Sequence, residues 1–135
     1  MTRWRWLSRL GMRKPTAPLF TLGHIVVTAA ARAALGDARV LPDELLKRHA
    51  AGDWGTVDDI DREQNELGMK LGLRLRSIYA VTAAGHTETA FAQQGLKPPT
   101  PLIEVWVITQ PNRTRTTILL PSEIFHDTSL EDATE

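Results

Sequence analysis

The sequence predicts an α+β fold, with helices in the N-terminal half of the chain and an antiparallel meander in the C-terminal half. Residues 74–81 and 102–120 carry the strongest β-strand signal, whereas residues 28–71 contain helix caps, helix stops and apolar positions at helical spacing. Segregation of strands from helices along a chain favours α+β over an alternating α/β architecture. We therefore expect an N-terminal strand and two to three helices packed on one face of a mainly antiparallel sheet of about four strands.

The chain is long enough for one domain with its own core. It has 135 residues, and a domain of this size buries about two-thirds of the surface that its unfolded chain exposes. We expect a basic Trp- and Arg-rich arm at residues 1–18, a single α+β domain at 19–124 and an acidic tail at 125–135. The arm is interpreted either as a binding segment for nucleic acid or an anionic membrane surface, or as a leader outside the fold.

Caps and breakers place the first elements. Residues 19–27 are rich in β-branched side chains and predict a strand. Thr28 is positioned to cap a short helix that Gly36 ends. Pro42 lies in the first turn of a second helix, which Gly52 ends.

A third helix is predicted to begin near Thr56 and to run to about Leu71. Thr56 and Asp59 have the spacing of a capping box, and Gly72 is suited to the C-terminal cap. His49, in the last turn of the second helix, is interpreted as a cation that the negative helix end favours.

The meander follows from side-chain alternation. In its first strand Arg74 and Arg76 share one face, and Tyr79 lies on the other. Residues 102–110 form a nearly continuous apolar run, as expected of a central strand that is covered on both faces. Residues 82–101 predict a long irregular connection with one helical turn, and Pro111-Asn112-Arg113 provides the turn into the last strand.

Composition excludes several classes of chemistry. There is no cysteine, so disulfides and thiolate sites are ruled out, and the four histidines do not have a metal-binding spacing. No Gly-rich phosphate loop and no GxSxG motif is present. Sixteen basic and sixteen acidic residues cancel, and no apolar run has the length of a membrane span. We expect a cytoplasmic protein that is not an integral membrane protein, with no cofactor or metal and no catalytic set, although enzymatic activity is left open.

Asp53 and Trp54 form the most distinctive short motif, because glycines flank them on both sides. In one interpretation Trp54 exposes an aromatic face that stacks on a base or on a partner side chain. In the other, Trp54 is a lid on the hydrophobic core and Asp53 accepts backbone N–H bonds.

Four arginines are candidates for a basic surface. Arg74 and Arg76 share a strand face, and Arg113 and Arg115 border the last turn. If the hairpin lies beside the first strand, their guanidinium groups form a face suited to phosphate or carboxylate. The alternative is a solvated sheet edge whose charge prevents edge-to-edge aggregation.

Several stretches, taken in order, resemble a family of small plasmid-related proteins from bacterial plasmids and integrated mobile elements. The resemblance covers about residues 19–124 and implies a mobile-element origin, but no activity. Some members carry the label of a type I restriction M subunit. A methyltransferase needs a larger α/β cofactor domain with a Gly-rich first turn, which this sequence lacks. The stretches are FTLGHIVVT, GDWG, Asn65-Glu66-Leu67, RLRSIYAV and VWVITQPNRTRTTILLPSEI.

A second resemblance is to RelE/ParE-type toxins, which also place helices before an antiparallel meander with an R-x-I-Y-x-V strand. It implies an RNA-directed toxin or nuclease with Arg74, Arg76, Tyr79 and Arg115 near the phosphate. The C-terminal Arg/His/Tyr cluster of a messenger RNA-cleaving member is not evident in the sequence.

These observations lead to one main hypothesis and two alternatives. The main one is a non-enzymatic accessory protein of a bacterial mobile element, which modulates host defence or element maintenance by binding a protein or a nucleic acid. Its candidate binding residues are Asp53, Trp54, Arg74, Arg76, Tyr79, Arg113 and Arg115. The alternatives are the RelE/ParE-like toxin or nuclease, and a homo-oligomeric module with Trp106 and Ile118 at the subunit contact.

Overall fold

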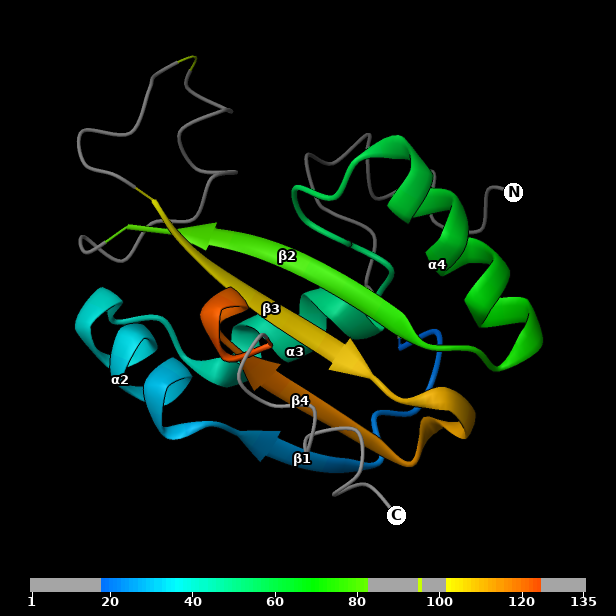
Figure 1. Ribbon diagram of the computed structural model, residues 1–135, viewed down its shortest axis with the longest axis horizontal. Helices are drawn as coiled ribbons and strands as arrows, with labels where there is room; N and C mark the ends of the chain where they lie inside the picture. Colours follow the sequence, from blue (N-terminus) through cyan, green and yellow to red (C-terminus); the bar gives the residue numbers. More distant parts are fainter. Residues whose placement is uncertain (1–17, 83–94, 96–101, 125–135) are drawn as a thin grey trace, which may run out of the picture.

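A four-stranded mixed sheet in the order β1-β4-β3-β2 forms the centre of the fold (Figure 1). This computed structural model describes residues 18–82, 95 and 102–124. β1 pairs in parallel with β4, whereas the β4–β3 and β3–β2 pairs are antiparallel. The predicted α+β class is confirmed. The strands are β1 (His24–Val27), β2 (Leu75–Val81), β3 (Ile103–Thr109) and β4 (Arg115–Leu119).

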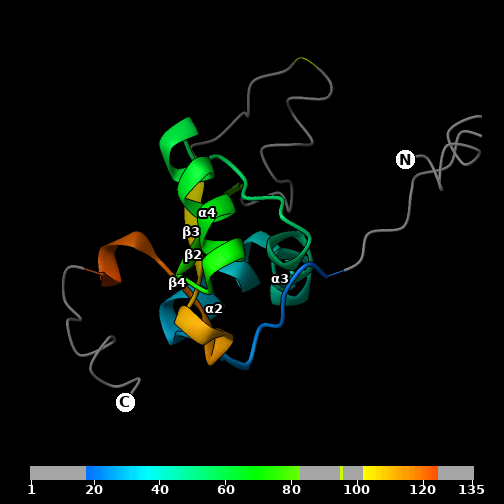
Figure 2. The same ribbon diagram turned by 90° about the vertical axis from the view of Figure 1, so that its right-hand side faces the viewer.

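The three α-helices of the described residues take two different positions relative to the sheet. Figure 2 shows α2 (Ala29–Ala38) and α3 (Pro42–Ala50) on one face, while α4 (Asp59–Leu71) runs along the outer edge of β2. The prediction of two to three helices on one face is met by α2 and α3, whereas α4 takes a separate position at the edge of the sheet. None of the helices in the described part of the chain is long and apolar enough to cross a membrane.

The N-terminal strand is shorter than predicted because the chain bends at Gly23. Gly23 has φ of +68°, and a Cβ there would overlap the carbonyl oxygen of Arg113. Regular pairing with β4 therefore starts only at His24. Before the bend, the Leu19 N–H bonds the carbonyl of Ala50 at 2.7 Å, which fastens this segment to the end of α3.

Helix boundaries follow the caps in part. Thr28 caps α2 as predicted, accepting from the Ala31 N–H, but the helix continues through Gly36. Asp58 caps α4 in place of Thr56, because the Thr56 N–H bonds the carbonyl of Ile78 in β2. Gly72 ends α4 in the left-handed conformation, as predicted.

The outer edge of β2 is closed by other parts of the chain. The Asn65 amide on α4 donates to the carbonyl of Arg76 at 2.7 Å and accepts from its N–H at 2.9 Å. Two residues further along β2, the N–H of Ile78 donates to the Trp54 carbonyl, and the carbonyl of Ile78 accepts from the Thr56 N–H. Backbone groups that would otherwise template another strand are thus satisfied.

The core lies between the sheet and the helices α2 and α3. Val105, Val107 and Ile118 are fully buried there, as the apolar pattern of the meander predicts. Because Ile118 lies in this core, its predicted role at a subunit contact is wrong. The predictions for residues 1–17, for most of the connection at 82–101 and for the tail at 125–135 lie outside the described residues.

Candidate functional site

The second face of the sheet is here called the open face, because no α-helix in the described part of the chain lies over it. Among the described residues, Figure 2 shows the short 3-10 helix η2 (Pro121–Glu123) on this side, opposite α3. In the strand register, Ile78 lies beside Trp106 on this face, and Trp106 lies beside Leu119. The open face therefore combines a hydrophobic strip with the polar residues described below.

Arginines from two different strands gather at one end of the open face. Arg74 and Arg76 project from β2 and its start, and Arg115 begins β4. Gln110 lies between them, since its N–H bonds the carbonyl of Arg115 at 2.8 Å. β2 and β4 are separated by one strand, so their backbones lie about 10 Å apart. His24 extends the row on β1, as the register partner of Arg115.

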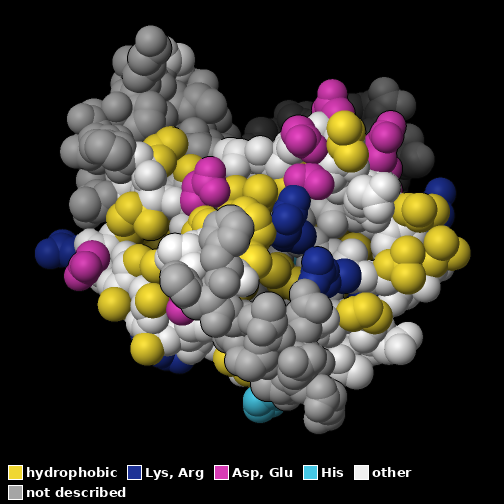
Figure 3. Space-filling model, viewed as in Figure 1, with side chains coloured by type: hydrophobic (Ala, Val, Ile, Leu, Met, Phe, Trp, Pro, Cys, Tyr) yellow, Lys and Arg dark blue, Asp and Glu magenta, His cyan; other side chains and the backbone are white. Residues whose placement is uncertain are grey.

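Figure 3 looks directly at this face. Basic side chains lie together beside hydrophobic ones, and acidic side chains gather over α4. The face is thus polarised, with positive charge on the sheet and negative charge along one border. The alternation of β2 predicts that Arg74 and Arg76 share a face, and the register brings Arg115 to the same end.

The Arg76 guanidinium is held in a defined position. Its Nη2 lies 2.6 Å from the Asp61 carboxylate, and its central carbon lies 4.5 Å from the centre of the Trp106 ring. Together with Asn65 and Arg74, the Arg76–Asp61 pair lines a polar hollow of about 190 Å³. Both partners of the ion pair are about one-third exposed. A planar donor beside an aromatic ring is suited to a planar or tetrahedral anion.

Thr117 adds an unsatisfied polar group to the same face. It is 3% exposed, and its Oγ1 has no hydrogen-bond partner within the described ranges. Thr117 is the register partner of Ile108, which in turn pairs with Arg76. The hydroxyl therefore lies in the same cross-strand row as Arg76. A buried hydroxyl without a partner costs about 1–3 kcal/mol.

Trp54 lies away from the open face. It is 2% exposed, stacks on Phe20 at 6.2 Å and meets the edge of His49 at 5.7 Å. The lid interpretation is thus the one that the structure supports. A stacking role for Trp54 is wrong, because no ring face is accessible.

Asp53 and Tyr79 form a structural contact rather than a binding pair. The Tyr79 hydroxyl donates to the Asp53 backbone carbonyl at 2.6 Å, and Tyr79 is fully buried on the core face. The exposed Asp53 carboxylate pairs with Arg48 at 2.7 Å and accepts from the N–H of Gly55. Arg48 also covers the Tyr79 ring at 4.4 Å. A position for Tyr79 beside the arginines is therefore wrong.

Arg113 serves α4 instead of the open face. Its two terminal nitrogens donate to the carbonyl of Leu73, just past α4, at 2.6 Å and to the carbonyl of Gly68, in the last turn of α4, at 2.8 Å. The Gly68 carbonyl also accepts from the backbone N–H groups of Gly72 and Leu73. Burial lowers the pKa of Arg113 from its usual value. Arg113 points toward α4 because of the turn before β4. Its backbone has φ of +60° there, and this conformation directs the side chain to α4. The predicted group of four arginines is reduced to three.

A buried polar chain around His49 was not predicted. His49 is fully buried; its Nδ1 lies 2.6 Å from Ser77 Oγ and its Nε2 2.8 Å from Thr109 Oγ1. The Thr116 hydroxyl donates to the Leu22 carbonyl, so it accepts from Thr109, which in turn accepts from Nε2–H. The imidazole is therefore the neutral Nε2–H tautomer, with Nδ1 accepting from Ser77.

The Ser77–His49 pair has the residue types of a nucleophile and its base, but it is sealed in the core. Burial, with a smaller contribution from the positive charge of Arg113, lowers the pKa of His49 to about 3. Such an imidazole is a poor base toward substrates that cannot reach it. A sequence signal for this network exists, because Ser77 and Thr109 occupy core-facing positions between apolar residues.

Neither a metal-binding group nor a comparison with known proteins adds a further site. Within residues 18–82 and 102–124, no group of three or more His, Asp or Glu side chains is arranged to hold a metal ion. No family model matches the chain, and no curated protein and no solved structure matches it either.

Proposed function

We propose that this chain is a non-enzymatic accessory binding protein of a bacterial mobile element, and that its open face binds the phosphate backbone of a nucleic acid. The observation that carries the proposal is the gathering of Arg74, Arg76 and Arg115 at one end of the open face, where Arg76 also lies over the ring of the half-buried Trp106. The mobile-element origin rests on the family resemblance of residues 19–124.

The chemistry of the open face favours nucleic acid over a protein partner. Guanidinium groups bind phosphate oxygens in a bidentate manner, and a strand two positions away sets a spacing of about 10 Å between the arginines. Phosphates along an extended single strand repeat at a comparable scale, so adjacent or alternate phosphates can reach both strands. Trp106, which is half-buried, supplies apolar contact for bases.

Asp61 has an opposing role in this proposal. Its carboxylate neutralises part of the Arg76 charge and lies on the acidic border formed by α4. It therefore keeps Arg76 in place but weakens the attraction for phosphate. Removing this charge by Asp61→Asn is expected to strengthen binding several-fold.

The experiment is fluorescence anisotropy of labelled single-stranded DNA, duplex DNA and RNA over a salt series, with the full chain. Arg74→Ala and Arg115→Ala are each expected to weaken binding and to lower the salt slope by about 0.7 for a single strand. The matched control is Arg32→Ala, an exposed arginine on α2, which lies on the other side of the sheet. Absence of binding at low salt, or equal losses in all three variants, would refute the proposal.

The toxin or nuclease alternative has no specific support from the described residues. It requires Tyr79 beside the arginines, and Tyr79 is buried on the opposite face.

A further inference from the structure

The two edges of the sheet differ in a way that points to an interface. The β2 edge is closed by Asn65 and by the segment 54–56, as described above. At the β1 edge, the N–H groups of His24 and Thr28 donate to the carbonyl of Thr114, just before β4, at 3.1 Å and to that of Ile118, in β4, at 3.0 Å. In a parallel pair of strands, every second residue directs its N–H and C=O groups toward the partner strand. Ile25 and Val27 are the residues between, so their N–H and C=O groups point away from β4. Nothing in the described part of the chain bonds them.

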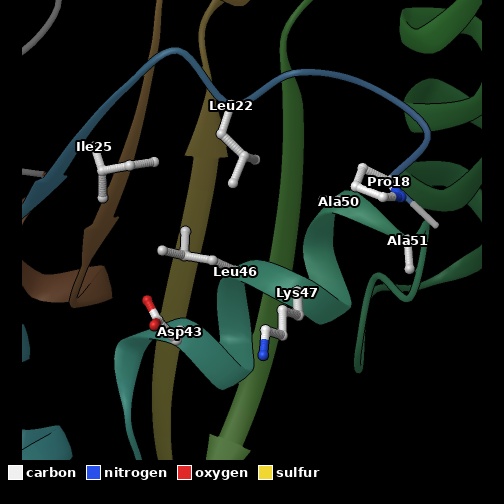
Figure 4. A pocket seen from close by; sticks show the side chains of 8 residues that line it. All are labelled: Pro18, Leu22, Ile25, Asp43, Leu46, Lys47, Ala50 and Ala51. Carbon is white, nitrogen blue, oxygen red and sulfur yellow. The ribbon is translucent and has the colours of Figure 1, made fainter. Parts of the chain in front are cut away.

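An apolar groove runs beside this edge on the helix side of the sheet. It has a volume of about 500 Å³, and Figure 4 shows Ile25 and Leu22 on one side and Leu46 of α3 on the other. A second hollow of about 310 Å³ continues it past Val27 to Leu41 at the start of α3. Ile25 is 38% exposed and Leu41 64% exposed. A free strand edge and exposed apolar groups thus lie side by side.

We propose that the occupant of this edge is a second copy of the chain, paired antiparallel through β1 about a two-fold axis at Val26. This axis places Ile25 of one copy opposite Val27 of the other, and both residues direct their backbone groups outward. Each such pair exchanges both of its N–H···O=C hydrogen bonds. The edge is therefore complementary to itself, which an isologous contact requires.

The charges on the rim of the groove fit the same symmetry. Asp43 and Lys47 lie one turn apart on α3 and both border the groove (Figure 4). α3 runs antiparallel to β1, since Leu41 lies near Val27 and Ala50 lies near Leu22. The two-fold axis exchanges these ends, so Asp43 of one copy faces Lys47 of the other. This order of charges is complementary to itself, which favours a second copy of the chain over a peptide of another protein.

The test is the mass of the full chain in solution, measured by sedimentation velocity over a wide concentration range. The wild type is expected to be a dimer at high concentration. Ile25→Pro removes an outward N–H without removing a bond to β4, and Ile25→Lys places a charge in the groove; both are expected to be monomeric. Thr21→Lys, which adds the same charge at an exposed position outside the groove, is the control and is expected to remain dimeric.

Amide hydrogen exchange of the wild type gives a readout that needs no variant. The N–H groups of Ile25 and Val27 are expected to exchange more slowly as concentration rises, whereas those of His24 and Val26, bonded to β4, are expected to be protected at every concentration. A monomer at high concentration would refute the proposal. So would a dimer that survives both Ile25 substitutions, or equal exchange of all four amides.

Discussion

The buried neutral His49 predicts a specific loss of stability in mild acid. The pKa of His49 is about 3 in the folded protein, against 6.5 for an exposed histidine. When the pH falls below 6.5 the unfolded chain takes up a proton that the folded chain does not. The stability is thus complete above about pH 6.5 and falls as the pH approaches 3.

The magnitude follows from the difference between the two pKa values. In the window between them, each pH unit lowers the free energy of unfolding by about 1.4 kcal/mol. From about pH 7.5 to about pH 4.5, this one group removes about 2.7 kcal/mol. That is a large share of the 5–15 kcal/mol typical of a whole domain.

The assay is urea unfolding, followed by tryptophan fluorescence at a series of pH values. Acidic groups also contribute to the pH dependence, so the wild type is compared with His49→Gln, which does not titrate. The difference between the two curves is expected to change by about 1.4 kcal/mol per pH unit in the window. His24→Gln, the same substitution at an exposed position on β1, is the matched control for the substitution itself.

Two results would refute this reasoning. One is a pH dependence that is the same in His49→Gln and in the wild type between about pH 6.5 and 4.5. The other is an NMR titration in which the His49 ring takes up its proton near pH 6.5 in the folded state. The same spectra test the tautomer, because Nδ1 is expected to carry the nitrogen shift of an unprotonated imidazole nitrogen.

Two further predictions concern a side chain that closes the edge of β2 and one that binds the end of α4. Asn65→Ala leaves the N–H and C=O of Arg76 without their partners. We expect it to lower the free energy of unfolding by about 2–3 kcal/mol in urea melts and to raise light scattering on storage; unchanged values of both would contradict the role given to Asn65. Arg113→Lys keeps the charge, but a single ammonium group does not reproduce the fork that binds Leu73 and Gly68. We expect it to cost about 1–2 kcal/mol, and a melt like that of the wild type would show that the charge alone suffices.

The fold could be predicted where a local pattern determines it. The alternation in β2 and the apolar run of β3 predict two strands, and the structure bears out both, with β3 at a central position. The prediction that β3 is covered on both faces is wrong, because the α-helices of the described residues leave the open face uncovered. The parallel pairing of β1 with β4 is not visible in either strand alone, because it depends on where α2, α3 and α4 bring the chain back. The prediction that Thr56 caps α4 is wrong for a similar reason. Its bond to Ile78, more than twenty positions away in the sequence, outweighs its tendency to cap a helix.

The candidate site divides in the same way. Arg74 and Arg76 share a face for reasons of alternation, so the sequence places them correctly relative to each other. Arg113 is adjacent to them in the expected hairpin, but its left-handed backbone turns it toward α4. Trp54 and Tyr79 are aromatic residues whose burial depends on tertiary packing. The burial of His49 is predictable from the sequence, because His49 follows Leu45 by four residues and so shares the buried side of α3.

The closed edge of β2 has a consequence for how far assembly can proceed. A sheet with two free edges can add molecules without limit and grow into a fibre. Here the Asn65 amide imitates the backbone of a neighbouring strand, so the β2 edge is already occupied within each molecule. Pairing through β1 uses the remaining edge of both copies at once. The assembly would therefore stop at two, with a continuous sheet that carries the basic face of each copy on the same side.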